Sequence, residues 1–341
     1  MSWQAVAAPT IPATAGIGAI AERPGPDRLL VAVGVWDWGA ASASAGGDAH
    51  LGAAWTSTDG VAWSKAVHID TARMLWDVAY GESRFVAVGA FTGKPSSGGV
   101  MLAAMAGGDA PGVWTSSDGM RWKAAKLRSG ASLVQVAFGD AGFVAVGSDP
   151  ACSQGCDELS TTPLYRSSDG SSWVMTGTIA GYVADLAAAP GRGYAAIVRD
   201  LDGCSRIWHS RDGLGWAETP SPDSRCLSGE WLLATGAGFA QIGLDYAEDD
   251  TATVSLSSSN DGLTWTSPVA VASGIGLPEA AGLLSDIIVI AGMEGIWELL
   301  PGEAGTRRPE DPASSFGAVG GGVGLRVTEQ GGVAILPTSL P

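Results

Sequence analysis

Five copies of one short motif, Ser-x-Asp-Gly-x-x-Trp, constrain the fold of this chain more than any other feature of its sequence. The copies occupy residues 57–63, 116–122, 167–173, 210–216 and 259–265, and successive copies start 59, 51, 43 and 49 residues apart. A repeat on this scale indicates that one small supersecondary unit recurs along the chain.

A second recurring element is an apolar run that ends in glycine, at Gly34, Gly89 and Gly147 and more loosely at Gly243 and Gly292. Together the two elements divide each repeat into four short apolar segments, which in the second repeat are residues 75–80, 84–88, 112–115 and 122–127. The 50 glycines and the lack of a 3.6-residue apolar period exclude helical repeats. Four short strands per repeat are typical of a β-propeller blade, so we predict an all-β propeller.

Two degenerate repeats follow the five that carry the motif. Residues 281–300 place Trp297 where earlier repeats have Trp55, Trp114, Tyr165 and Trp208, and residues 316–336 supply only three strands. We expect the N-terminal segment around Trp3 to supply the fourth strand, because such closure leaves no exposed sheet edge. We therefore predict one domain, residues 1–341, with seven four-stranded blades: motif-bearing blades over about 15–272, and degenerate ones over about 273–341 plus 1–10. A six-bladed ring is the alternative.

The motif resembles the Asp box, or BNR repeat, of sialidases, sortilin-type receptors and exported bacterial propellers. The resemblance covers about residues 50–270 and implies the propeller fold, but a propeller hosts many unrelated functions. In such a turn the carboxylate accepts hydrogen bonds from backbone amides, glycine takes a positive φ, and tryptophan packs between sheets. We expect this structural role, rather than calcium ligation, for the box aspartates Asp59, Asp118, Asp169, Asp212 and Asp261.

The net charge of −16, from 19 basic and 35 acidic residues, disfavours nucleic acid and anionic membrane surfaces as partners. No apolar stretch is long enough to span a bilayer. The N-terminal residues lack the basic region of a signal peptide, so we expect that the protein stays inside the cell or that its leader has been removed.

Acidic residues recur just beyond the second strand of several repeats. Asp149, Asp245 and Glu294 lie two residues past the glycine, Asp200 takes the matching place in the fourth repeat, and Asp37 lies one residue further on in the first. Around a ring they would project toward the mouth of the central channel, where they suit Ca²⁺ or a cationic ligand. The alternative is that they are solvated loop residues. Trp36 and Trp38 flank Asp37 and could stack on a sugar or anchor a protein, and packing across the channel mouth is the alternative.

A sialidase-like glycoside hydrolase is the competing interpretation. A sialidase needs an arginine cluster that grips the substrate carboxylate, and a tyrosine nucleophile with an acidic partner. The usual Arg-Ile-Pro signature is missing, and Arg73, Arg199, Arg326 and Tyr246 follow no spacing that singles out such a site. No other catalytic motif is present, and His209 lies in a different repeat from His50 and His68.

Cys152, Cys156, Cys204 and Cys226 all belong to connections expected on one face of neighbouring blades. Their spacing fits a structural zinc site poorly, and we expect disulfides Cys152–Cys156 and Cys204–Cys226 on proximity. Disulfides imply an oxidising compartment, so we predict an extracellular, periplasmic or cell-surface bacterial protein. We expect a monomeric, non-catalytic binding or scaffolding module without a cofactor, apart from the Ca²⁺ alternative, that engages a carbohydrate or protein ligand through its acidic loop-rich face.

Overall fold

The structure is a computed structural model that describes residues 4–5, 11–12, 15–36, 51–69, 72–91, 112–127, 133–147, 161–200, 204–220, 228–247, 251–276, 278–284, 287–292, 295–299, 306–309, 314–320, 323–328 and 333–337. Its regular elements are β-strands, and the described strands form seven antiparallel sheets in chain order, numbered here sheets 1 to 7. Within the described residues, no helix has the length and apolar character needed to cross a membrane.

The first three sheets follow one another in the chain. Sheet 1 contains β2 (Gly16–Arg23), β3 (Leu29–Val35), β4 (Gly52–Ser57) and β5 (Val67–His68). Sheet 2 contains β6 (Ala72–Gly81), β7 (Arg84–Phe91), β8 (Gly112–Ser116) and β9 (Lys123–Ala124). Sheet 3 contains β11 (Leu133–Gly139), β12 (Gly142–Gly147), β13 (Thr161–Ser167) and β14 (Ser172–Ala180), and β10 (Lys126–Leu127) adds a short parallel strand to the outer edge of β14.

The other sheets repeat this order. Sheet 4 contains β15 (Tyr182–Ala189), β16 (Gly193–Arg199), β17 (Ser205–Ser210) and β18 (Ala217–Glu218). Sheet 5 contains β19 (Ser228–Thr235), β20 (Gly238–Tyr246), β21 (Thr251–Ser259) and β22 (Val269–Gly276). Sheet 6 contains β23 (Pro278–Leu284), β24 (Ile287–Gly292), β25 (Gly295–Leu299) and β26 (Thr306–Pro309). Sheet 7 contains β27 (Ser314–Gly320), β28 (Val323–Thr328) and β29 (Val333–Pro337), and β1 (Gln4–Ala5) pairs with β29.

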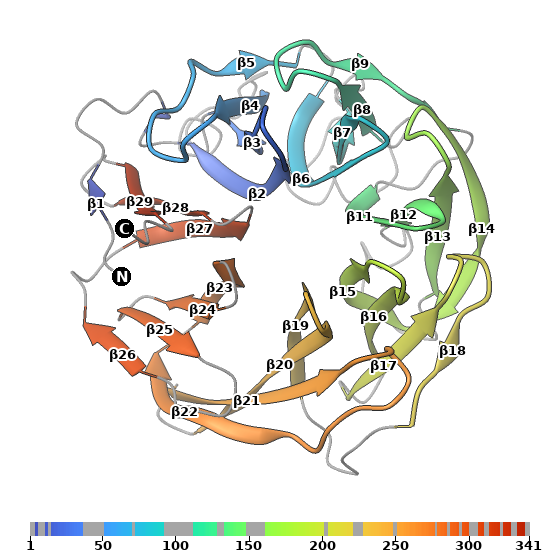
Figure 1. The fold of residues 1–341 in the computed structure, drawn as a ribbon, viewed down its shortest axis with the longest axis vertical. Coiled ribbons are helices and arrows are strands. Elements are labelled where there is room, and N and C mark those ends of the chain that lie inside the picture. Colours follow the sequence, from blue (N-terminus) through green and yellow to red (C-terminus); the bar gives the residue numbers. More distant parts are fainter. Residues whose placement is uncertain are drawn as a thin grey trace, which may run out of the picture.

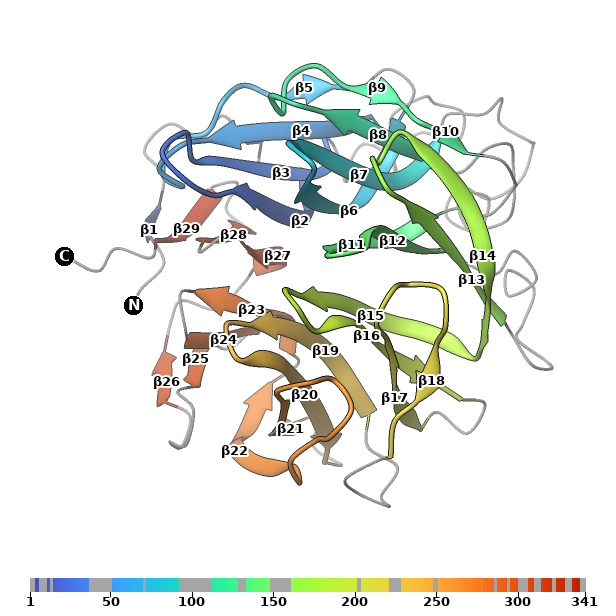
Figure 2. The same cartoon turned by 45° about the vertical axis from the view of Figure 1, so that its right-hand side comes forward.

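The sheets are arranged around a central axis, with the first strand of each sheet innermost (Figure 1). Consecutive first strands contact one another, and β27 contacts both β23 and β2. The turned view shows neighbouring sheets packed face to face (Figure 2). This is the all-β, propeller-like arrangement that the repeat predicts.

The hydrophobic core lies between the sheets rather than at one centre. Phe85 and Trp114 of sheet 2 pack with Val31 of sheet 1, while Val86 packs in the next cluster, with Phe143 of sheet 3. Among the described residues, sheets 2 to 5 are therefore covered on both faces. Middle strands such as β12 are buried throughout, which explains why their sequences are continuous apolar runs rather than alternating patterns.

A β-bulge in the innermost strand explains the glycine that ends many second strands. The pairing register shifts just after Ile17, Leu75 and Leu133, and these residues pair with Gly34, Gly89 and Gly147. A Cβ at Gly34 would collide with the carbonyl oxygen of Gly16, and one at Gly89 with that of Met74. Glycine is needed there because two backbones approach too closely for any side chain.

Candidate functional site

The two ends of the sheets have different roles. In an antiparallel sheet, the connection from the second to the third strand and the turn from the third to the fourth lie at opposite ends of the third strand. The Ser-x-Asp-Gly-x-x-Trp turns follow β4, β8, β13, β17 and β21, and so they share one end, which we call the box end. The connections after β3, β7, β12, β16 and β20 share the other end, which we call the loop-rich end.

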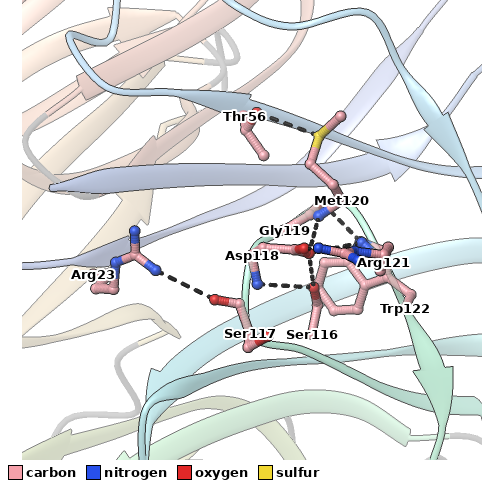
Figure 3. Close-up of polar contacts among 9 residues, drawn as sticks. All are labelled: Arg23, Thr56, Ser116, Ser117, Asp118, Gly119, Met120, Arg121 and Trp122. Atoms are coloured by element: carbon pink, nitrogen blue, oxygen red, sulfur yellow. Dashed lines mark hydrogen bonds and ion pairs between the residues drawn. The ribbon is translucent and has the colours of Figure 1, made fainter. Parts of the chain in front are cut away.

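At the box end, Asp118 organises its turn (Figure 3). Its Oδ1 accepts hydrogen bonds from the backbone amides of Met120 (2.9 Å) and Arg121 (2.8 Å) and from the hydroxyl of Ser116 (3.1 Å). Its Oδ2 accepts a 2.9 Å bond from Nε of Arg121. Gly119 supplies the positive φ of 70°, and its carbonyl oxygen accepts the indole N–H of Trp122.

The other four turns repeat this geometry. Each carboxylate Oδ1 accepts the backbone amides two and three residues further on, at 2.8 to 3.2 Å, in the turns of Asp59, Asp169, Asp212 and Asp261. The indole N–H bonds to the box glycine in three of the four, whereas Nε1 of Trp216 is buried without a hydrogen-bond partner in the described part of the chain. The box carboxylates are therefore committed to holding their own turns.

The box turns also touch the preceding sheet. Arg23 donates to the carbonyl oxygen of Ser117 at 3.3 Å, and the hydroxyl of Thr56 contacts Sδ of Met120 at 3.6 Å (Figure 3). Arg84 donates to the hydroxyl of Ser171 at 2.6 Å in the next turn along the chain. These contacts join neighbouring sheets.

We expect the stability of the fold to decrease as the pH falls below about 4. The backbone amides of Ala62 and Val61 lower the pKa of Asp59, and those of Thr264 and Leu263 lower that of Asp261. A carboxyl with a lower pKa in the folded chain contributes stability above its unfolded pKa, near 3.8, and loses it as the pH falls through the folded pKa. Urea unfolding midpoints between about pH 5 and pH 2 measure this decrease. A flat profile would contradict it.

At the loop-rich end, Asp200 and Asp245 lie at the ends of the second strands of neighbouring sheets. Asp200 closes its own turn, because its Oδ1 accepts the amide of Cys204 at 2.9 Å, and its Oδ2 lies 3.6 Å from Nε of Arg206. Asp245 is exposed and pairs with Thr253 across β20 and β21. Asp37, Trp38, Asp149 and Glu294 lie outside the described residues.

Trp36 packs against another side chain of its own sheet, His68. Its ring contacts that of His68 edge to face, with the two ring centroids 4.9 Å apart. Its backbone amide donates to the carbonyl oxygen of Leu51. His68 belongs to β5, the outermost strand of sheet 1, whereas β2 is the innermost (Figure 1). The structure therefore places this ring toward the outer edge of its sheet.

Cys204 forms a disulfide bond. Cys152, Cys156 and Cys226 lie outside the described residues. Among the described residues, no group of three or more His, Cys, Asp or Glu side chains is placed to hold a metal ion.

A polar row that the sequence analysis missed lies along the innermost strands. Asp77, Gln135 and Asp185 each follow the β-bulge of β6, β11 and β15. Each side chain reaches the next sheet. Asp77 Oδ2 accepts the amide of Val136 at 2.8 Å, and Asp185 Oδ2 accepts the amide of Leu232 at 2.7 Å. Between them, Gln135 Nε2 donates to the carbonyl oxygen of Ala184 at 2.9 Å and to Asp185 Oδ1 at 3.3 Å. The signal in the sequence was one polar residue at the same position of three consecutive apolar runs.

Burial raises the pKa of Asp77 to about 6 and that of Asp185 to about 7, and the negative charge of Asp77 adds to the shift of Asp185. A pKa near neutrality suits a general acid. However, both carboxylates also accept backbone amides of their own and the neighbouring strands, so their geometry is that of links between sheets.

No protein-family model matches the sequence, and no curated protein matches it. Solved structures resemble the fold. A structure of YCF48 bound to D1 peptide aligns over 99% of this chain and 97% of its own, with a TM-score of 0.59 and 14% identity. The WD40 domain of Neurospora crassa Pan2 aligns over 100% and 98%, with a TM-score of 0.57 and 10% identity. The GH74 enzyme of Niastella koreensis aligns over 96% of this chain but only 44% of its own, with a TM-score of 0.53 and 16% identity. This likeness supports the β-propeller fold alone.

Proposed function

We propose that this chain is a single seven-bladed Asp-box propeller, closed by its N-terminal strand. Seven described sheets, the antiparallel pairing of Gln4 with Ile335, and the contacts of β27 with both β23 and β2 support this proposal. The five equivalent box turns support the Asp-box assignment.

We further propose that the protein is a non-catalytic binding module that engages a basic protein segment at its loop-rich end. The observation that carries this proposal is the division of acidic residues between the two ends. The five box carboxylates are committed to turn amides, whereas Asp245 is exposed at the opposite end. Asp200 lies at the same end as Asp245, and its side chain is 38% exposed although it accepts the amide of Cys204 and lies near Arg206. The net charge of the chain is −16. Asp37, Asp149 and Glu294 are the further acidic residues of this proposed surface. YCF48, which shares the fold, is seen with a bound peptide, and this favours a protein ligand over a carbohydrate.

The test is a binding screen with lysine-rich, neutral and acidic peptides, neutral and sialylated glycans, and Ca²⁺ alone. We expect salt-sensitive binding of the basic peptides, because exposed carboxylates attract cations through screened electrostatics. The double variant Asp200→Asn, Asp245→Asn should weaken binding about three- to tenfold. Asp140→Asn is the matched control, because Asp140 is exposed at the β11–β12 turn, on the box end.

Two outcomes would contradict this function. Equal losses in the double variant and in the Asp140 variant would remove the loop-rich end from the interaction. Hydrolysis of a fluorogenic sialoside or a glucan would favour a glycoside hydrolase, the class to which the similar GH74 enzyme belongs.

We also propose that the protein is exported and monomeric, with Cys204 bonded to Cys226 and Cys152 bonded to Cys156. The disulfide at Cys204 supports an oxidising location. Titration of unreduced protein with a thiol reagent should find no reactive cysteine. Four reactive thiols would contradict both the pairing and the location.

A further inference from the structure

The polar row Asp77–Gln135–Asp185 forms a continuous connection along four neighbouring innermost strands, β6, β11, β15 and β19. Each hydrogen bond described above crosses from one sheet to the next. The residues that follow the equivalent bulges in sheets 1, 5, 6 and 7 are Ala19, Trp231, Ala280 and Gly317. The carboxylate and amide links are therefore a local feature of sheets 2 to 5 and not a requirement of the repeat.

Within the described residues, one member of the row, Gln135, has an unsatisfied side-chain acceptor. Oε1 of Gln135 is a buried acceptor without a hydrogen bond in the described part of the chain, although Nε2 of the same amide lies 3.3 Å from Asp185 Oδ1. An ionised carboxylate offers no donor, whereas a protonated one gains an O–H group. Protonation of Asp185 therefore adds a donor beside the amide of Gln135 and removes a charge from the interior.

Backbone amides compensate that charge only in part. The main cause of both raised pKa values is burial, and among the described residues the only charged neighbour that contributes to the shift of Asp185 is Asp77, which is of like sign. Besides Asp77 and Asp185, the strands of the row and the strands that contact them carry these titratable residues: Glu22 and Arg23 of β2, Arg73 and Tyr80 of β6, Arg84 of β7, Tyr165 and Arg166 of β13, Tyr182 of β15, Tyr194 and Arg199 of β16, Arg206 and His209 of β17, Glu230 of β19, Asp245 and Tyr246 of β20, and Glu279 of β23.

We propose that Asp77, Gln135 and Asp185 form a pH-responsive tie, a row of hydrogen bonds that holds sheets 2 to 5 together and is more stable in mildly acidic solution. A carboxyl whose pKa is higher in the folded than in the unfolded chain binds a proton in the folded state first. Stability is therefore gained as the pH falls from above the folded values, about 6 and 7, toward the unfolded value of 3.8. This direction is opposite to that of the box carboxylates.

Hydrogen exchange of the linked amides tests the tie in the full chain. After correction for intrinsic exchange rates, the amides of Val136 and Leu232 should exchange more slowly at about pH 5 than at about pH 7.5. We expect the equilibrium constant for local opening to fall about tenfold or more, because one pKa unit corresponds to a factor of ten. The amide of Gly191 is the internal control, because it donates at 2.7 Å to the exposed carboxylate of Asp140 between sheets 3 and 4, the pair that Gln135 and Asp185 also link.

Two variants separate charge from structure. Asp185→Asn is neutral and carries an N–H donor, so at pH 7.5 it should show the slow exchange of Leu232 that the wild type shows at pH 5. Asp140→Asn should leave the pH response unchanged. The tie is overturned if Val136, Leu232 and Gly191 respond equally to pH in the wild type, a result that needs no variant to fold. The tie is also overturned if the exchange of Leu232 in the Asp185→Asn variant depends on pH as strongly as it does in the wild type.

Discussion

Replacing Gly89 with alanine should destabilise the fold by about 3 kcal/mol, near the upper end of the range for overpacked interiors. The added Cβ would meet the carbonyl oxygen of Met74, at the point where the bulge of β6 brings two backbones together. A backbone group cannot rotate away as a side chain can, so β6 or β7 would have to move, and both are packed between neighbouring sheets. The urea midpoint by tryptophan fluorescence measures the loss.

Gly177→Ala is the matched control for this substitution. Gly177 also lies in a strand, β14, but a Cβ there would have no heavy atom within 4 Å. We expect a change within about 0.5 kcal/mol, as for most unobstructed surface positions. Equal losses in the two variants would show that close approach of the backbones is not the reason for the glycine.

Asp118→Ala should destabilise the protein by about 2 kcal/mol and leave binding at the loop-rich end unchanged. The substitution leaves the amides of Met120 and Arg121 and the hydroxyl of Ser116 without their acceptor, and hydrogen bonds to charged groups are among the stronger ones. Thermal melting, together with the peptide binding assay, measures both expectations. An unchanged melting temperature would contradict the structural role of the box.

Two further variants divide the contributions within this turn. Asp118→Asn keeps one acceptor oxygen for the amides and should cost less than alanine. Arg121→Ala removes only the exposed ion pair with Asp118 and should cost no more than about 0.5 kcal/mol, because surface ion pairs contribute little. A loss as large as that of Asp118→Ala would mean that the ion pair, rather than the amide acceptor, stabilises the turn.

Local geometry was well predicted wherever one short segment contains both partners of an interaction. The box turn is such a case, since the carboxylate, the amides it accepts and the glycine with positive φ lie within five residues of one another. Aromatic residues of the third strands, such as Trp55 and Trp114, were likewise expected in the core, and both are buried.

Site residues were harder to predict because their environment comes from other strands. Trp36 was a candidate for stacking on a ligand, but the return of the chain to β5 places His68 against its ring. Asp200 was grouped with other acidic residues by its position after a strand, but Arg206 and the amide of Cys204 occupy its oxygens. Neither partner could be inferred from the spacing that singled these residues out.

The sequence by itself determined the all-β fold and the propeller-like repeat, because the motif spacing, the turn glycines and the apolar runs are properties of consecutive residues. Only the tertiary structure revealed what the polar residues of the innermost strands do. Asp77, Gln135 and Asp185 are 58 and 50 residues apart in the chain, and the ring of sheets brings each within hydrogen-bond distance of the next strand. The burial that raises their pKa values depends on all the sheets around them, and no short segment of sequence contains that information.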